Sequence, residues 1–382
     1  HIPMERSEAS SRLKSPDIFK GIAISFIVVL HLAIASKGDV GDPAPVIQAL
    51  YLGLVGFFIM SGYFFKPGRG FRENLRRRSR LFLVLLIVAA AVLPLISFLW
   101  CSLWGQPTDF DDLVSCMTRT FALERTFVPF DERLPWAICG FSMGYYFLWC
   151  MLFAFVIFYA IADRIRDDAR LGALAIAVLL GVTIAYRELF DFSLPMYANL
   201  SPMAAAFMIC GMYLAKFDLV GKVESGAVGN PKWWGLFLGS TAILLVMVHL
   251  LPPSIDFDYM NFGKFGGYSA VPYIFEGVLS FVMILYISFF FSKIPVISTV
   301  FEKIGEHTMG ILLLHVFIAK MALAPFYTFN DVDCLPAEFA GVARLVLSFA
   351  SLFVSYLICE YGPRMLIRLG ILGKDAEGGT IF

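Results

Sequence analysis

Residues 17–36 read DIFKGIAISFIVVLHLAIAS, an apolar run whose interior is interrupted by Lys20, Ser25 and His31. A helix needs roughly 20 mainly apolar residues to cross the hydrocarbon core of a bilayer. The run has this length, and its residues do not alternate between polar and apolar as a barrel strand would. The stretch therefore predicts a helix that spans a membrane.

The whole chain has the composition of an integral membrane protein. Of its 382 residues, 59% are hydrophobic and 16% are charged, and the mean hydropathy is +0.77. Soluble domains average about 25% charged residues, so the composition argues against a disordered chain and against a nucleic-acid partner. The seven cysteines are scattered without a CxxC pair, so the sequence indicates neither a metal site nor a disulfide framework.

Ten apolar stretches of spanning length follow one another along the chain. They predict an all-α integral membrane protein, a bundle of about ten transmembrane helices in which residues 18–360 form one domain between cytoplasmic tails at 1–17 and 361–382. The predicted spans are 18–36, 46–65, 81–101, 138–162, 170–187, 198–215, 233–251, 270–292, 308–326 and 340–360.

The placement of lysine and arginine predicts the orientation of this bundle. With both termini in the cytoplasm, 22 of the 30 basic residues lie on the inner side, as cytoplasmic loops require. A cleaved signal peptide ending near Ala33-Ile34-Ala35 is the alternative. It is disfavoured because the apolar run is longer than a typical signal core, and because its removal would break the even number of spans.

Two segments on the outer side combine aromatic rings with carboxylates. Residues 102–137 form the longest connection and are expected either to pack over the bundle as a lid or to be a solvated connector. In residues 252–269, Tyr259 and Tyr268 lie near Asp256 and Asp258. This composition suits a sugar-binding surface, although aromatic residues at the membrane interface give the same pattern.

Ionisable groups inside the predicted spans are the candidate functional residues, because a charge in the bilayer costs about 2.5–3.5 kcal/mol. They are Lys20, His31, Glu276 and His315. Lys20 and His31 are eleven residues apart, which places them on one helix face about 16 Å apart along the axis. A cation can hold phosphate there, and an imidazole can act as a general base. The alternatives are a snorkelling Lys20 and structural hydrogen bonds for the other three residues.

The densest charge cluster is the predicted inner loop at residues 66–80, with seven cations and one acid. Arg77, Arg78 and Arg80 lie at the expected start of a helix, where guanidinium groups suit phosphate geometry. The cluster would also serve as a topology determinant or as a contact for anionic lipids. The chain has no Walker A, HExxH or GxSxG motif, so nucleotide hydrolysis and metalloprotease chemistry lack support.

Several motifs in this order resemble the acyltransferase-3 family of membrane O-acyltransferases. They are the basic residue and histidine of the first span (Lys20 and His31), FFIMSGYFF at 57–65, the arginines at 77–80, YFLW at 146–149 and IGEHTMGILLLH at 304–315. Two residues depart from the family pattern. Lys20 replaces a commoner arginine, which weakens the argument for bidentate phosphate contact, and Tyr146 stands where tryptophan is usual.

The resemblance implies transfer of an acyl group, usually acetyl from cytoplasmic acetyl-CoA, to a hydroxyl of a glycan or other cell-envelope acceptor. A multi-pass protein of a bacterial-type cytoplasmic membrane is expected. His31 is the expected base with His315 and Glu276 as helpers, while Lys20, Arg77, Arg78 and Arg80 would hold the donor. A transporter of a small solute or acyl group is the rival hypothesis, followed by a non-catalytic sensor or scaffold. The sequence does not indicate the acceptor.

Overall fold

The computed structural model describes residues 13–33, 45–104, 109–122, 146–190, 194–251, 266–323 and 337–368. These residues are 91% helical and include no strand, so the predicted all-α class is confirmed. The helices are α1 (Lys14–Ala33), α2 (Pro45–Tyr51), α3 (Gly53–Tyr63), α4 (Phe71–Ile87), α5 (Leu93–Leu103), α6 (Phe110–Ala122), α8 (Tyr146–Ile165), α9 (Ala169–Leu189), α10 (Ser201–Leu214), α11 (Leu219–Glu224), α12 (Pro231–Leu250), α13 (Ala270–Ser292), α14 (Pro295–Glu306), α15 (Thr308–Leu323) and α16 (Ala337–Arg368). Shorter segments are the π-helical η1 (Val88–Val92) and the 3-10 helices η3 (Pro195–Leu200), η4 (Ala215–Phe217), η5 (Ala227–Gly229) and η7 (Gly266–Ser269).

Eight helical stretches in the described residues are long and apolar enough to cross a membrane. They are Pro45–Tyr63, Phe71–Leu103, Phe147–Ile165, Ala169–Leu189, Pro195–Phe217, Pro231–Leu250, Ala270–Ser292 and Leu345–Met365, and each overlaps a predicted span. The first and ninth predicted spans overlap α1 and α15, of which α15 is apolar over a shorter stretch. A multi-pass membrane protein is therefore confirmed, while the count of ten and the orientation stay predictions.

Local sequence explains where some helices begin. The Asp168 carboxylate accepts hydrogen bonds from the backbone N–H groups of Arg170 and Leu171, at 2.8 and 3.2 Å, and caps α9. The side-chain oxygen of Asn230 accepts a hydrogen bond from the Lys232 N–H at 3.1 Å and caps α12. Both helices thus start at the residue that satisfies their first N–H groups.

The start of α1 is held by a distant residue instead. The Glu224 carboxylate, at the end of α11, accepts hydrogen bonds from the backbone N–H groups of Lys14 (3.1 Å) and Ser15 (2.9 Å). An anion at a helix N-terminus is stabilised by the helix dipole and by the otherwise unpaired N–H groups. The position of α1 therefore depends on a segment about 210 residues later in the chain.

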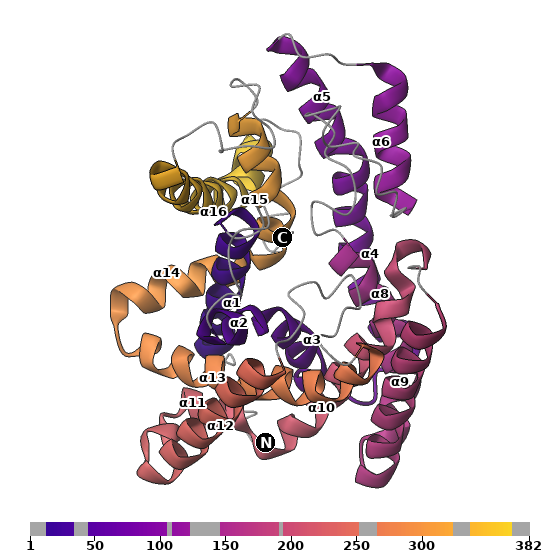
Figure 1. The fold of residues 1–382 in the computed structure, drawn as a ribbon, viewed down its shortest axis with the longest axis vertical. Coiled ribbons are helices and arrows are strands. Elements are labelled where there is room, and N and C mark those ends of the chain that lie inside the picture. The colour runs from indigo at the N-terminus through magenta and orange to yellow at the C-terminus, as the bar shows by residue number, and fades with distance from the viewer. Residues whose placement is uncertain are drawn as a thin grey trace, which may run out of the picture.

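Helix α1 lies in the middle of the structure (Figure 1) and packs against α3, α13, α14, α15 and α16. From Ser15 to Val29 none of its side chains is exposed. Protein therefore surrounds α1 along most of its length. A helix in this position cannot be a simple lipid-facing anchor.

Glycines allow α1 and α14 to approach until their backbones touch. A methyl group on Gly21 would overlap the backbone carbonyl of Phe301, and one on Gly305 would overlap the carbonyl of Asp17. Close crossings at small residues are a common way to pack helices in membranes. The presence of Gly305 in the motif at 304–315 is thus explained by its contact with the first span.

A second crossing of the same kind joins α3 and α10. A methyl group on Gly62 would overlap the carbonyl of Met208, and one on Gly211 would overlap the carbonyl of Ile59. Beside Gly62, the Tyr63 hydroxyl accepts a hydrogen bond from the Val220 N–H at 3.1 Å. The FFIMSGYFF motif therefore fixes helix packing.

The segment predicted as a lid or a connector contains α6, which packs against η1 and α5 and runs beside α5 in Figure 1. Its Leu113 and Cys116 are buried, whereas Phe110 and Val114 are exposed. Cys116 is disulfide-bonded, so the expectation of a chain without disulfides is wrong at this residue. Sequence spacing could not reveal this bond because two cysteines need only meet in space.

Candidate functional site

Lys20 and His31 both lie on α1, which continues unbroken past His31. An uninterrupted helix preserves their predicted separation of about 16 Å and their shared face. The side chain of His31 lies outside the described part of the structure. The structure therefore places the backbone of His31 on the central helix, as its predicted role requires.

Lys20 is paired with Asp17, one turn earlier on α1. The Lys20 Nζ lies 2.5 Å from the Asp17 Oδ1, and Asp17 is buried whereas the Lys20 side chain retains 30% exposure. The spacing of three residues is typical of helical ion pairs and was visible in the sequence, although the prediction did not use it. Lys20 therefore has a carboxylate beside it in addition to any anion that it would bind.

His315 is fully buried on α15, which packs against α1. Its Nδ1 lies 2.9 Å from the backbone carbonyl oxygen of Ile311. A carbonyl can only accept, so Nδ1 carries the proton and the lone pair of the neutral ring lies on Nε2. The ring is thus oriented by its own helix, in the tautomer that a general base acting through Nε2 would need.

Glu276 is 1% exposed on α13, and its Oε1 has no hydrogen-bond partner among the described residues. The neighbouring Gly277 faces the side chains of Phe207 and Val55. Helix α13 packs against α1, α3, α10 and α12, so Glu276 belongs to a different part of the core from His315. Both helices contact α1, which is the element that could connect the two residues.

The three predicted arginines have different surroundings on α4. Arg77 and Arg80 are exposed. The Arg78 guanidinium carbon lies 6.0 Å from the centre of the Phe155 ring on α8, and Arg78 also interacts with the Tyr159 hydroxyl. A guanidinium over a ring face gains cation–π stabilisation. Arg78 is exposed as well, so all three arginines present their charges to the solution or membrane surface, and Arg78 also helps to dock α4 on α8.

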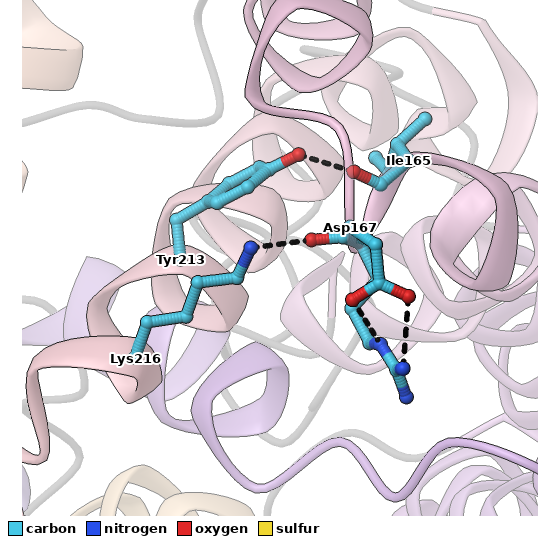
Figure 2. A network of polar contacts seen from close by, with 5 residues as sticks. Ile165, Asp167, Tyr213 and Lys216 are labelled. Carbon is cyan, nitrogen blue, oxygen red and sulfur yellow. Dashed lines mark hydrogen bonds and ion pairs between the residues drawn. The ribbon is translucent and has the colours of Figure 1, made fainter.

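The turn between α8 and α9 is held by a polar network from α10 and η4 (Figure 2). The Tyr213 hydroxyl donates to the backbone carbonyls of Ile165 and Asp168, and the Lys216 Nζ donates to the Arg166 carbonyl at 2.6 Å. Arg166 in turn makes a two-pronged hydrogen bond to the neighbouring Asp167 at 3.0 and 2.9 Å. This bond lowers the pKa of the Asp167 carboxyl and raises that of Arg166. The network fixes the turn between α8 and α9 against the end of α10.

A polar cluster between α15 and α16 was not predicted. His307, which the sequence gave no reason to single out, has its Nε2 2.9 Å from Glu360 Oε2, and the other oxygen of Glu360 accepts from Arg364 at 2.9 Å. His307 and Glu360 are both largely buried. Their separation of 53 residues leaves no local pattern that could have revealed the pair.

Comparison with known proteins identifies the family of the chain. No curated protein and no solved structure matches the chain. A family model described as an acyltransferase domain matches residues 13–360, from the start of α1 into α16. The match includes every residue predicted for the site and both glycine crossings. The chain therefore belongs to the acyltransferase-3 family of membrane acyltransferases.

Proposed function

We propose that this protein is an O-acetyltransferase of a bacterial-type cytoplasmic membrane. It takes acetyl from cytoplasmic acetyl-CoA and transfers it to a hydroxyl of a glycan or other cell-envelope acceptor. The proposal places both termini in the cytoplasm and ten helices across the membrane. Helices α1 and α15 join the eight apolar stretches to make the ten.

The disulfide at Cys116 supports this orientation. With the N-terminus inside, α6 lies on the outer side of the membrane. Disulfides form and persist in oxidising compartments such as the periplasm, and are rare in the cytosol. The described cysteines that are free, Cys101, Cys150, Cys210 and Cys359, all lie within helices assigned to the membrane.

The observation that carries the proposal is the enclosure of α1. Placing a lysine and a histidine on a membrane helix is costly unless these residues face protein or a polar path. The helix that holds Lys20 and His31 is the one that α3, α13, α14, α15 and α16 surround. A catalytic base on this helix would be shielded from lipid and within reach of both membrane surfaces.

The inner cations suit a long donor. Arg77 and Arg80 lie on α4, which packs mainly against α8, whereas Lys20 lies on α1. Cations on two different helices suit a ligand with phosphates at one end and an extended arm, which is the shape of acetyl-CoA. Exposed guanidinium groups are well suited to the phosphates. Arg78, which is also exposed, is the third proposed donor contact, and its guanidinium additionally packs on Phe155.

The proposed chemistry is a single acyl transfer. His31 accepts the proton of the acceptor hydroxyl, and the hydroxyl oxygen attacks the thioester carbonyl. The carbon–sulfur bond breaks, and the protonated imidazole returns the proton to the departing thiolate. The products are an ester and CoA. We assign proton relay to His315, because its ring is oriented by the Ile311 carbonyl and it lies on α15, which packs against α1.

The test uses protein purified in lipid nanodiscs with radiolabelled acetyl-CoA and glycans extracted from the cell envelope. His31→Ala should reduce label transfer by about 10²–10⁴-fold, the contribution of a positioned acid or base. The same variant should still bind CoA. The Arg77→Gln, Arg80→Gln double variant should lose CoA affinity, because it removes two phosphate contacts.

The matched control is Arg170→Gln, which removes one exposed cation from the start of α9. It should leave both CoA affinity and turnover within twofold of wild type. The proposal is overturned if wild type neither binds nor consumes acetyl-CoA when glycans are present. Uptake of a solute into sealed vesicles without CoA release would favour a transporter instead.

A further inference from the structure

The outer end of the α5 and α6 pair gathers exposed aromatic rings. Trp100 in the last turn of α5 and Trp104 directly after this helix are 39% and 44% exposed, and Phe110 at the start of α6 is 67% exposed. Figure 1 shows the chain leaving α5 and entering α6 at the same end of this helix pair. The exposed rings of both helices therefore lie at the same end of the pair.

Carboxylate residues flank Phe110 in the sequence. Asp109 and Asp111 are both exposed, and an Asp109 oxygen accepts a hydrogen bond from the Asp111 N–H at 3.0 Å. A carboxylate in hydrocarbon costs about 2.5–3.5 kcal/mol, so two in one turn place that turn in water. Phe110 thus exposes its ring outside the hydrocarbon core of the membrane.

The surface is held rigidly. The rings of Trp100 and Trp104 meet edge to face with centroids 5.9 Å apart, and the Trp100 indole N–H donates to the backbone carbonyl of Met321 at 3.2 Å. On α6, Leu113 and the disulfide-bonded Cys116 are buried against η1 and α5. A preorganised ring platform loses little entropy when a ligand binds.

The hydrogen bond to Met321 also places the platform relative to the site. Met321 and His315 lie on one helix six residues apart, which is about 9 Å along α15. A short oligosaccharide resting on the platform would cover this distance. The platform is thus on the outer side, at the end of the helix that carries a candidate catalytic histidine.

We propose that Trp100, Trp104 and Phe110, with the carboxylates of Asp109 and Asp111, bind the glycan chain of the acceptor. Apolar faces of sugar rings stack on the aromatic rings, and sugar hydroxyls donate hydrogen bonds to the carboxylates. The two negative charges favour neutral or amine-bearing sugars over acidic ones. This proposal rests on the proposed acetyltransferase function, because it assigns the second substrate of that reaction.

The test measures glycan binding and transfer separately. Neutral envelope oligosaccharides of four to six sugars are titrated into the protein in nanodiscs without acetyl-CoA, and binding is followed by microscale thermophoresis. Trp104→Leu and Phe110→Leu keep an apolar side chain but remove the ring. Each variant should weaken glycan binding about tenfold and raise the KM for the acceptor glycan by a similar factor. The KM for acetyl-CoA should stay within twofold of wild type. Asp109→Asn with Asp111→Asn should reduce the preference for amine-bearing over acidic sugars.

Trp234→Leu is the matched control, because Trp234 is an exposed tryptophan on α12 with 38% exposure. It should leave glycan binding unchanged. Equal binding by wild type and both platform variants would overturn the proposal, as would equal weakening in the control, which would identify these rings as membrane-interface residues. Binding without any acetyl transfer would keep the platform and refute the proposed reaction instead.

Discussion

Helices α1 and α9 are both apolar and of similar length, yet they occupy opposite environments. No described side chain of α1 from Ser15 to Val29 is exposed, whereas only 11% of the apolar window of α9 is buried. Gly21 on α1 touches the backbone of another helix, while Gly181 on α9 has nothing near it. Lipid is as apolar as a protein core, so hydrophobicity does not decide which helix lies at the centre.

The difference lies in close backbone contact and in polar partners. α1 is fixed by glycine crossings, by the Glu224 carboxylate at its start and by the Lys20–Asp17 pair. α9 depends on its local cap and on the network at its first turn. Substitutions at the centre should therefore be costly, and similar substitutions at the periphery should be tolerated.

The largest effect is expected at the crossing of α1 and α14. Gly21→Ala places a methyl group on the Phe301 carbonyl, which cannot yield as a flexible side chain would. Overpacking of this kind costs about 3 kcal/mol or more, so little monodisperse protein should be recovered. Size-exclusion chromatography of a fluorescent fusion in detergent measures this yield.

Gly181→Ala provides the comparison for that experiment. The position is open, and alanine favours a helix by roughly 1 kcal/mol over glycine, so the yield should be unchanged or higher. Equal yields from Gly21→Ala and Gly181→Ala would contradict the distinction between an enclosed and a peripheral helix.

A smaller loss is expected at the link between α15 and α16. Glu360→Gln removes the charge that both His307 and Arg364 contact, and leaves the largely buried His307 without a charged acceptor. We expect a loss of about 1–3 kcal/mol, measured as a lower melting temperature. Arg364→Gln should cost less because its side chain is 59% exposed. The reverse order would mean that His307 is not the important partner.

The stabilisation that the Glu224 carboxylate gives to the start of α1 should be lost in acid. Burial raises the pKa of Glu224, but hydrogen bonds from Ser15 and Lys14 and the charge of Lys14 lower it by more, so the net pKa lies below the usual 4.5. A carboxyl group whose pKa is lowered by folding stabilises the folded state at neutral pH, and this contribution is lost as pH falls through the folded pKa. Glu224→Gln should cost about 0.5 kcal/mol at pH 7, discounted for exposure. Its melting temperature should approach that of wild type between roughly pH 5 and pH 3.

The smallest effect is expected at the turn shown in Figure 2. Arg166→Ala removes the exposed pair with Asp167 but leaves the Lys216 bond, which uses the backbone carbonyl of residue 166. Exposed ion pairs contribute little to stability, so the melting temperature should not change measurably. A large drop would show that this peripheral turn is as tightly coupled as the centre.

The sequence was sufficient to predict the helical class, because a long continuous apolar run can satisfy its backbone groups in lipid only as a helix. It also placed Lys20 and His31 on one continuous helix. It could not identify which helix is central, since Gly21 and Gly181 look alike until their neighbours are known. The His307–Glu360 pair and the Cys116 disulfide were missed for the same reason, because long-range contacts leave no local pattern. The packing of Arg78 on the Phe155 ring is likewise a contact between distant residues that the sequence could not reveal.

The contact between Gly21 and Phe301 also has a consequence for biosynthesis. About 280 residues separate the two, and at about 5–20 residues per second the ribosome needs roughly a quarter of a minute to a minute to make them. During this time the first helix lacks its closest partner. The pairing of Lys20 with Asp17 is available from the start, because both lie within one turn of the nascent helix. Each charge in this pair partly neutralises the other, which lowers the free-energy cost of burying the two charges before Phe301 is synthesised.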